Sequence, residues 1–433
     1  MKIRLLLKFK ALLVLSVCIH SLPCFAQGLP ITQPERVGLS SKRLTLIDGY
    51  MQSVVEEGKI SGAVVLIARR GKTVYFKTFG WMDIETNRAM EKDALFRIAS
   101  MTKPITCTVA MTLYEEGLFL LNDPVWKYIP EFKDPRVLVL PASDGQEPES
   151  YQTIPAEGEI HVRHLLNHTS GISYGNGPHD RIYRDAGLKL GDPPRRELTS
   201  TGDLVRTLAG LPLLHQPGEK FTYGYSHDVV GYLIEVLDGA PMDVSYRERL
   251  FEPLGMKDKD TDFILSDEKR DRLASVYRHG KGGKLEKIQV RPENSNSLSE
   301  KRIFSGGGGL YSTISDYARF CQMILNGGKL DGVRILSRKT VELMTTNSLG
   351  EGYAPFRVVS GDKYGYGLYI RTERGVYDEI ESMGTLSGGG GLKTRYWIDP
   401  EEQMICILMA QLRGGNWLMH HKFRNLAYQA IVN

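Results

Sequence analysis

The chain has 433 residues, of which 42% are hydrophobic and 24% are charged. This length and composition favour a globular protein with one large or two medium domains, and they exclude a disordered or fibrous chain. The 55 lysine and arginine residues barely exceed the 51 aspartate and glutamate residues, so no strong basic field draws the protein to nucleic acid.

Residues 1–26 have the pattern of a secretory signal peptide. Basic residues near the start precede an apolar run over residues 11–19, which is too short to span a bilayer. Cys24 and Ala26 then place small residues three before and one before a cleavage point after Ala26. We therefore expect a secreted or periplasmic mature chain with a net charge near zero and no stable membrane insertion.

The first part of the mature chain is expected to form a helix, a β-hairpin and a second helix. Hydrophobic periodicity predicts the first helix over residues 44–55, and two β-rich runs over residues 63–68 and 73–80 predict the hairpin. The second helix is expected to begin at Ser100 and to end near Glu116, because a glycine follows.

The later elements suggest a sheet built from both ends of the chain. Residues 121–300 mix loops with helical patterns, and the stretches 141–158 and 280–300 read as loops or lids. Helices are expected at 161–168, 201–209, 227–237, 316–325 and 421–432, and strands at 366–371, 393–398 and 404–410. We therefore expect an α/β (α+β) fold with a sheet part, 27–120 plus 301–433, and a largely helical insert, 121–300.

Three cysteines remain after the leader: Cys107, Cys321 and Cys406. They are scattered, lie in apolar surroundings and lack the spacing of a zinc site. We expect buried thiols, and a single bridge between two of them is left open.

One of three Ser-x-x-Lys sequences has the context of a nucleophile. Ser100-Met101-Thr102-Lys103 has uncharged spacers and leads into an apolar helix, whereas the sequence at 266–269 contains two acids and that at 360–363 is a turn. Residues i and i+3 share a face at the start of a helix, so the Lys103 amine can lie beside the Ser100 hydroxyl. Such a pair can activate a serine for acyl transfer.

Residues 95–103, Leu-Phe-Arg-Ile-Ala-Ser-Met-Thr-Lys, resemble the nucleophile segment of the serine β-lactamase-like superfamily. This group includes class C β-lactamases, D-amino-acid peptidases and family VIII esterases. The resemblance continues in order through residues 69–71, 165–171, 216–219 and 308–313. It implies a β-lactamase/transpeptidase-like fold, with an antiparallel sheet flanked by helices, and catalysis at Ser100 and Lys103 without a metal or organic cofactor.

The second superfamily element is a Tyr-x-Asn box, which Tyr225-Ser226-His227 resembles. The resemblance implies that Tyr225 relays protons, a role for which Lys103 must favour the phenolate. His227 replaces the asparagine and is expected to bind substrate or to shift the proton network. Tyr223 is the alternative relay tyrosine.

The third element is Lys-Thr-Gly in β-lactamases and often Trp-Gly-Gly in esterases, and it corresponds to Gly388-Gly389-Gly390. An N–H of this run is expected to form an oxyanion hole with that of Ser100. The register is open by one residue, because four glycines adjoin. The missing lysine disfavours substrates that carry a carboxylate, although Lys393 and Arg395 lie close by as substitutes.

A rival nucleophile is Ser173, because Gly171-Ile172-Ser173-Tyr174-Gly175 matches the G-x-S-x-G elbow of α/β-hydrolases. That elbow needs a preceding strand and a following helix, whereas a helical segment precedes it here and turn residues follow. Ser100 is therefore favoured.

Two further clusters are expected to be structural. Three histidines share one helical face and suggest a metal site, but they lie in a segment of the resemblance; they are His161, His164 and His168. The run Gly306 to Gly309 lacks the residues of a phosphate loop and is expected to form a tight bend at the active-site floor.

Together these features predict an exported serine hydrolase that cleaves carboxylic esters or related acyl compounds through an acyl-enzyme on Ser100. Its expected partner is a small-molecule ester, amide or lactam. A β-lactamase or a D-amino-acid peptidase/DD-carboxypeptidase is the first alternative. A non-catalytic penicillin-sensing or peptidoglycan-binding module is the second.

Overall fold

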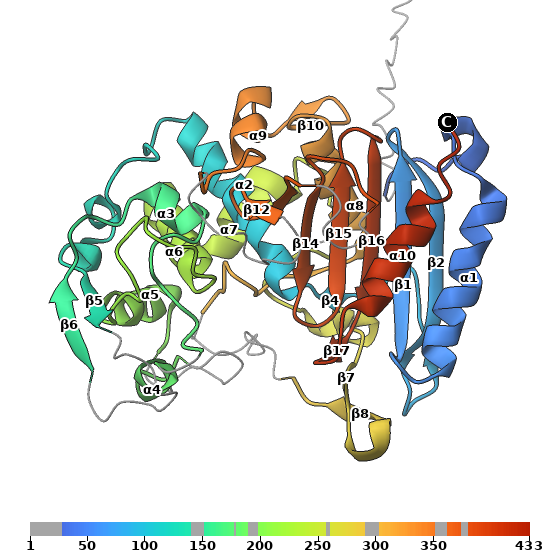
Figure 1. The fold of residues 1–433 in the computed structure, drawn as a ribbon, viewed down its shortest axis with the longest axis horizontal. Helices are drawn as coiled ribbons and strands as arrows, with labels where there is room; N and C mark the ends of the chain where they lie inside the picture. The colour runs from blue at the N-terminus through green and yellow to red at the C-terminus, as the bar shows by residue number, and fades with distance from the viewer. Residues whose placement is uncertain are drawn as a thin grey trace, which may run out of the picture.

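The computed structural model describes residues 28–139, 151–176, 179–188, 198–256, 260–290, 303–350, 362–373 and 380–433. Its central layer is an eight-stranded sheet whose neighbouring strands are all antiparallel (Figure 1). In spatial order the strands are β12 (Asp362–Tyr364), β13 (Tyr369–Arg371), β14 (Leu386–Gly390), β15 (Thr394–Asp399), β16 (Met404–Ala410), β1 (Gly62–Arg69), β2 (Lys72–Asp83) and β3 (Arg88–Ala89). Both ends of the chain build this sheet, as the sequence predicts.

The middle of the sheet joins its early and late strands. β1 pairs with β16 from Ala63 opposite Ala410 to Arg69 opposite Met404. All of β1 is buried, and its alternate residues enter two different core clusters, one on each face. Successive side chains of a strand point to opposite faces, and both faces are buried here. β1 therefore reads as a continuous apolar run.

Two helices cover each face of the sheet (Figure 1). α1 (Ser41–Glu56) and α10 (Leu418–Tyr428) pack on one face, and α2 (Thr102–Glu115) and α8 (Ile314–Leu325) pack on the other. The Ser40 hydroxyl caps α1 by accepting the Arg43 N–H. α2 is buried from Thr102 to Leu113 and ends before Gly117, whose φ of 76° only glycine adopts readily.

The helical part lies to one side of the sheet (Figure 1, left). Its helices are α3 (Val162–Leu166), α4 (Asp180–Asp185), α5 (Thr201–Ala209), α6 (Ser226–Asp238) and α7 (Met242–Tyr246), and α9 (Arg338–Met344) follows α8. α6 contacts α2, α3, α5 and α7, so it is the helix that joins this part to the start of α2.

Short strands form four smaller sheets. They pair β4 (Phe96–Arg97) with β9 (Tyr311–Ser312), β5 (Arg136–Val139) with β6 (Gln152–Pro155), β10 (Lys329–Leu330) with β11 (Val333–Arg334), and β7 (Val276–His279) with β8 (Leu285–Ile288) and β17 (Leu412–Arg413). β6 and β8 fall in stretches expected to be loops. The predicted insert is thus less purely helical than expected, and its β7 pairs with a strand from the sheet part.

The structure also bears on the expected late strand, the cysteines and membrane insertion. The strand predicted over residues 366–371 is only in part a strand. Residues 369–371 form β13, and Gly367, with a φ of 83°, lies in the turn that joins β13 to β12. The three cysteines outside the leader are free and buried. In the described part of the chain, no helix has the length and hydropathy needed to cross a membrane. The predicted leader, 1–26, lies outside the described residues.

Candidate active site

Ser100 lies in a short 3₁₀ turn, η2 (Ala99–Met101), between β4 and α2. Ala99, directly before it, has a φ of 44°, in the left-handed region that non-glycine residues rarely occupy. Ser100 itself is partly exposed. The turn therefore places a partly exposed serine just ahead of a buried helix.

Lys103 lies one turn later and is only 1% exposed. Its Nζ is 3.2 Å from the Ser100 Oγ, 2.7 Å from the Gly307 carbonyl oxygen and 3.1 Å from the Tyr174 hydroxyl. The Ser-x-x-Lys spacing thus brings amine and hydroxyl together as the sequence predicts. A buried amine at this distance can take the proton of the serine.

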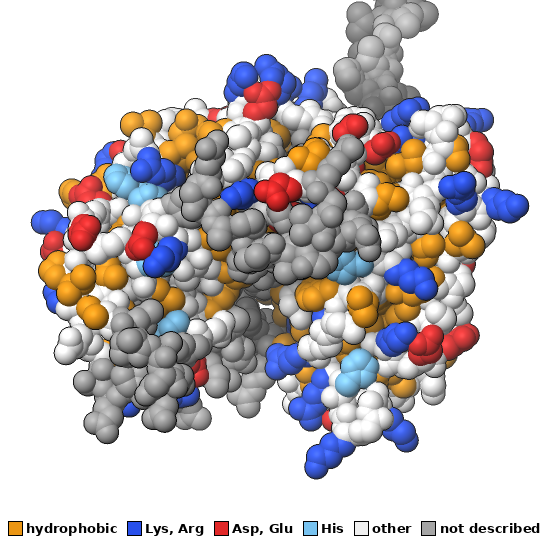
Figure 2. All heavy atoms as spheres, in the orientation of Figure 1, with side chains coloured by type: hydrophobic (Ala, Val, Ile, Leu, Met, Phe, Trp, Pro, Cys, Tyr) orange, Lys and Arg blue, Asp and Glu red, His pale blue; other side chains and the backbone are white. Residues whose placement is uncertain are grey.

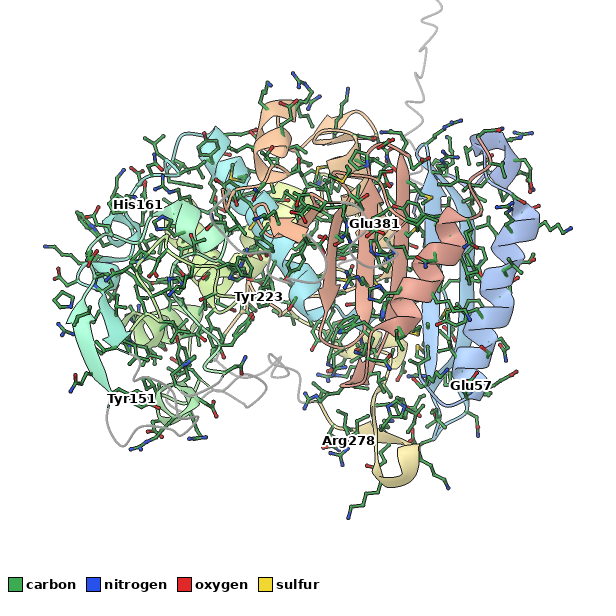
Figure 3. All side chains as sticks on the ribbon, in the orientation of Figure 1. Glu57, Tyr151, His161, Tyr223, Arg278 and Glu381 are labelled. Carbon is green, nitrogen blue, oxygen red and sulfur yellow. The ribbon has the colours of Figure 1, made fainter. Side chains whose placement is uncertain are left out.

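The tyrosine that the sequence favours has its hydroxyl elsewhere. Tyr225 precedes α6, and its hydroxyl donates to the Leu188 carbonyl oxygen at 2.8 Å. Tyr223, labelled in Figure 3, instead places its ring 4.5 Å from the Lys103 Nζ, while Tyr174 reaches the same nitrogen through its hydroxyl. The geometry therefore favours Tyr174 and Tyr223 over Tyr225 as partners of Lys103.

Tyr223 and Tyr174 differ in their access to a substrate. Tyr223 is partly exposed, whereas Tyr174 is only 7% exposed. Tyr174 belongs to the sequence that resembles a nucleophile elbow, and this is why its part in the site was missed: the motif drew attention to Ser173 beside it.

His227 lies inside the protein and does not reach the surface. Its ring lies 4.3 Å from that of His168, which is also fully buried. Burial holds the pKa of both imidazoles well below the usual range, and the nearby Lys103 charge acts in the same direction. This corrects the expectation of a direct substrate contact, because His227 is a neutral, buried neighbour of the site.

Asp228 is a site residue that the sequence analysis did not identify. It is 1% exposed, and its Oδ1 accepts the Ser305 hydroxyl at 2.6 Å and the Gly307 N–H at 3.3 Å. Burial raises the pKa of this carboxyl, against the lowering effect of Ser305 and Lys103. An acid at the third position of a helix is common, so the sequence held no sign of this position.

The glycine run 306–309 forms a tight turn between α2 and α6, as expected. Thr106 donates to the Gly306 carbonyl oxygen at 2.6 Å, and Lys103 donates to that of Gly307. A Cβ on Gly306 would overlap the His227 carbonyl oxygen, so this turn needs glycine for close packing. The turn fixes Lys103 and α6 relative to each other.

The predicted glycine box forms the end of strand β14. Gly390, the last residue of the strand, lies against the turn that carries Ser100. A Cβ on Gly390 would overlap the Ile98 carbonyl oxygen, two residues before Ser100. A Cβ on Gly388 would lie 2.7 Å from the Tyr396 ring. These close approaches explain the glycines, and they place the strand end beside Ser100.

The directions in which the backbone N–H groups of β14 point indicate which glycine can donate to an oxyanion. The Arg371 N–H donates to the Thr385 carbonyl oxygen, so the odd-numbered residues of β14 face β13 and the even-numbered ones face β15. β13 begins opposite Ser387. The N–H groups of Gly389 and Gly391 therefore lie beyond the end of β13, whereas those of Gly388 and Gly390 face β15.

Lys393 and Arg395 do not present an exposed anchor for a carboxylate. Lys393 is 3% exposed, donates from its Nζ to the Gly415 carbonyl oxygen at 2.9 Å, and lies 4.0 Å from the Trp417 ring centre. Arg395 is 7% exposed and lies over the Trp397 and Trp417 rings. Both side chains are thus packed into the protein.

Ser173 is held in a local network. Its hydroxyl lies 3.2 Å from the His179 Nε2 and accepts the Gly175 N–H at 3.0 Å. The residue is buried, and the described residues directly after it, 174–176, are not helical, whereas an elbow requires a helix there. This serine therefore stabilises the loop that carries Tyr174.

Two histidines of the predicted helical face, His161 and His164, contact each other, and the third, His168, lies elsewhere. The His161 Nδ1 lies 2.6 Å from the Asn122 carbonyl oxygen, and the His164 Nδ1 accepts the His161 N–H. His168 is the one of the three that reaches the site, where its ring lies 4.5 Å from that of Tyr223.

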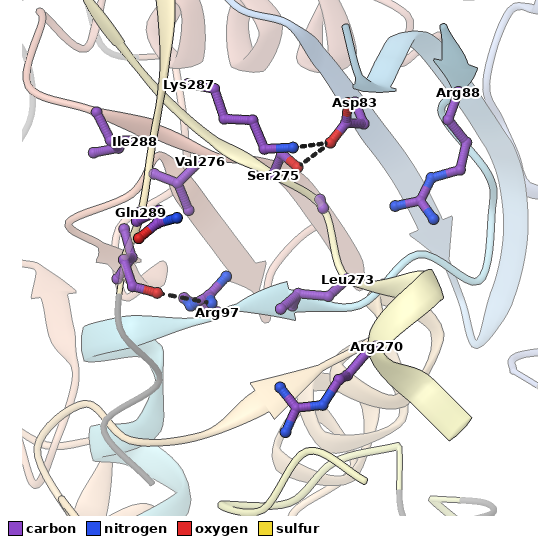
Figure 4. Close-up of a pocket in the computed structure, with 12 residues that line it drawn as sticks. Asp83, Arg88, Arg97, Arg270, Leu273, Ser275, Val276, Lys287, Ile288 and Gln289 are labelled. Carbon is purple, nitrogen blue, oxygen red and sulfur yellow. Dashed lines mark hydrogen bonds and ion pairs between the residues drawn. The ribbon is translucent and has the colours of Figure 1, made fainter. Parts of the chain in front are cut away.

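A separate cavity of about 420 Å³ lies beside β4 (Figure 4). Arg88, Arg97 and Lys287 line it, together with Asp83, which pairs with Lys287 and accepts the Ser275 hydroxyl. Ser100 and Lys103 are not among its lining residues.

Comparisons with known proteins cover the sheet and the helical part alike. The family described as Beta-lactamase matches residues 46–431. Protein Rv1367c of Mycobacterium tuberculosis is 35% identical over 381 residues, which cover 84% of this chain and 90% of that protein. Esterase EstB of Burkholderia gladioli is 28% identical over 386 residues, which cover 84% of this chain and 89% of that protein. The solved structure of EstCE1, described as a hydrolase with promiscuous acyltransferase activity, has a TM-score of 0.72 and 25% identity and covers 90% of this chain and 98% of its own.

Proposed function

The chain belongs to the beta-lactamase family of serine hydrolases, and from this premise we propose that it hydrolyses carboxylic esters through an acyl-enzyme on Ser100. The observation that carries the proposal is the 3.2 Å contact between the Lys103 Nζ and the Ser100 Oγ, with the amine buried and the hydroxyl partly exposed.

In the first step the Ser100 Oγ attacks the ester carbonyl carbon while its proton passes to the Lys103 amine. The carbonyl oxygen becomes an oxyanion, for which the Ser100 N–H and that of Gly389 or Gly391 are the donors. Collapse of this intermediate breaks the bond to the alcohol and leaves the acyl group on Ser100. Water then attacks the acyl-enzyme by the same route and releases the acid.

The leaving alkoxide needs a proton, which a tyrosine beside Lys103 can supply while it takes back the former serine proton from the Lys103 ammonium. We assign this relay to Tyr223, because it combines contact with the Lys103 amine and partial exposure. Tyr174 is buried and hydrogen-bonded to the same amine, so its role is to hold Lys103 in place.

Esters are favoured over β-lactams and peptides that end in a carboxylate. The glycine box lacks a lysine, and the nearby Lys393 and Arg395 are packed against tryptophan rings. A substrate carboxylate would thus lose its hydration without gaining a cationic partner there. The relative named as an esterase supports the same substrate class.

The test compares kcat/KM for p-nitrophenyl butyrate, nitrocefin and an acylated D-Ala-D-Ala peptide. We expect the ester to be preferred by at least roughly tenfold, since the loss of one charged contact is worth about this much. Equal or better turnover of nitrocefin would identify a β-lactamase, and preference for the peptide would identify a carboxypeptidase. A lasting penicillin adduct without turnover would identify a sensor.

We also propose that the chain is exported and that its leader is removed after Ala26. The support is the basic start, the short apolar run and the small residues before that position. N-terminal sequencing of the protein from a periplasmic or culture fraction should begin at Gln27. An uncleaved chain in the cytoplasm would contradict this.

A further inference from the structure

Asp228 lies at the start of α6 as a buried carboxylate beside the catalytic amine. Its Oδ1 accepts hydrogen bonds from Ser305 and from the Gly307 N–H. Its Oδ2 is buried and has no hydrogen-bond partner within the described part of the chain. A buried carboxylate oxygen without a hydrogen bond destabilises a fold. The presence of Asp228 at this position therefore calls for a role beyond packing.

Gly307 connects Asp228 to Lys103. Its N–H donates to the Asp228 Oδ1, and its carbonyl oxygen accepts from the Lys103 Nζ at 2.7 Å. A Cβ built on Gly307 would lie 2.6 Å from the Asp228 Oδ2 and 3.2 Å from the Tyr174 hydroxyl. The carboxylate, the phenol and the amine thus surround one glycine, which leaves no room for a side chain.

Three further ionisable groups are in electrostatic contact with Lys103: Cys107, His168 and His227. Burial raises the pKa of the Cys107 thiol and lowers the pKa of both imidazoles, so these groups stay neutral. Asp228 is the acid in this set: burial raises the pKa of its carboxyl, whereas the Lys103 charge lowers it, so an ionised Asp228 and the Lys103 ammonium stabilise each other.

We propose that Asp228 is a positioning residue, whose carboxylate acts through Gly307 to hold the Lys103 amine at Ser100 and to stabilise the ammonium that forms when Lys103 takes the serine proton. This inference rests on the proposed role of Ser100 as nucleophile. The proton moves from the Ser100 Oγ to the Lys103 Nζ, and Asp228 takes no proton. The carboxylate of a Ser-His-Asp triad orients and stabilises its base in a comparable way.

The test is Asp228→Asn, which keeps the size of the side chain and an oxygen for Ser305 but removes the charge. We expect kcat for p-nitrophenyl butyrate to fall by roughly 10- to 100-fold, the scale of one lost electrostatic contact in an active site, while KM changes little. The melting temperature should not fall at pH 8, because removal of a buried charge relieves a desolvation cost. Asp238→Asn, at the other end of α6, is the matched control and should leave both rate parameters unchanged.

A second readout separates this inference from the ester proposal. The rate at which a fluorophosphonate labels Ser100, followed by intact mass, reports serine activation without ester turnover. If the wild type is labelled but hydrolyses no ester, the ester proposal fails, and the labelling rate of Asp228→Asn still tests Asp228. If the wild type is not labelled at Ser100, both proposals fail.

If Asp228→Asn does not fold, two glycine variants provide the test instead. Gly307→Ala places its Cβ against the Asp228 carboxylate, whereas a Cβ on Gly308 meets its nearest atom at an ordinary 3.8 Å. Gly307→Ala should slow labelling, and Gly308→Ala should not. The inference is overturned if Asp228→Asn is within about fivefold of the wild type per folded molecule, or if the two glycine variants are equally slow.

Discussion

Tyr174 and Tyr223 both lie against the Lys103 amine, one through its hydroxyl and the other through its ring. Their chemical roles follow from exposure, since a proton relay must reach the leaving group and a purely orienting group need not. Tyr225 is directed instead at the Leu188 carbonyl oxygen.

Three single hydroxyl deletions separate these roles. Tyr223→Phe should lower kcat by roughly 10²–10⁴-fold, the usual scale of general acid–base catalysis, and Tyr174→Phe should lower it by about tenfold. Tyr225→Phe should leave kcat near normal. The measurement is kcat on one ester, with the melting temperature of each variant. A large loss in Tyr225→Phe alone would restore the role implied by the sequence resemblance.

The sequence predicted some of these residues and missed others for identifiable reasons. Ser100 and Lys103 are three apart on one helix, so local geometry alone brings them together. Tyr174 and Tyr223 come from loops before α4 and α6, and their directions depend on packing between distant segments. Asp228 gains its role from a glycine turn almost eighty residues later in the chain, which no local pattern records.

At the scale of elements, β14 must approach the nucleophile turn closely. Gly390 lies where a Cβ would overlap the Ile98 carbonyl oxygen and the Thr394 hydroxyl, whereas a Cβ on Gly391 would meet nothing within 4 Å. The strand end and η2 therefore share one tightly packed contact beside Ser100.

Gly390→Ala should reduce both stability and activity. Overpacking of this contact should cost roughly 1–3 kcal/mol and should shift η2, so kcat should fall with the melting temperature. Gly391→Ala keeps its backbone N–H and has room for a methyl group, so it should resemble the wild type. Thermal melts and ester kinetics on the two variants provide the measurement, and an unaffected Gly390→Ala protein would refute this packing account.

α8 carries a carboxyl group whose burial affects stability. Asp316 lies in the first turn of α8, where it accepts the Thr261 hydroxyl at 2.9 Å. Burial raises the pKa of Asp316 from 3.8 to about 7, despite this hydrogen bond. The folded state therefore binds this proton more tightly than the unfolded state does.

The contribution of Asp316 to stability should consequently decrease as the pH rises from about 4 to about 7, because the folded protein must then lose a proton that it holds tightly. Asp316→Asn removes this dependence and keeps an acceptor for Thr261. We expect the variant to be more stable than the wild type at pH 8, by roughly 1–4 kcal/mol, and to match it near pH 4. Urea unfolding at the two pH values measures the difference, and a variant that is less stable at pH 8 would contradict the assignment.

The positions of the longer helices and strands were more predictable from the sequence than the pairing of the short strands. Periodicity located α1, α2, α5, α6, α8 and the strands β1, β2, β15 and β16, because each buries one face or a whole strand. β6 and β8 lie in stretches whose polar, turn-rich sequence predicts loops. Their partners lie on other short segments, so their hydrogen bonds are not visible in local sequence.

At the scale of the whole molecule, the residues of the candidate active site come from widely separated segments of the chain. η2 and α2 supply Ser100 and Lys103, while α6 and the loops before α4 and α6 supply Asp228 and the tyrosines. On the face shown in Figure 2, basic and acidic side chains are interspersed, in keeping with the nearly balanced charge of the chain. Substrate choice is thus expected to depend on local contacts rather than on long-range charge.

The central claim is that Ser100 forms the covalent intermediate, and active-site labelling tests it most directly. The wild type, Ser100→Ala and Ser173→Ala are incubated with a fluorophosphonate, and the labelled residue is located by peptide mass mapping alongside ester turnover. We predict one adduct on the peptide that contains Ser100, with loss of activity in proportion to labelling. Ser173→Ala should be labelled and active, and Ser100→Ala should be neither. An adduct on Ser173, or full ester turnover by Ser100→Ala, would contradict the account.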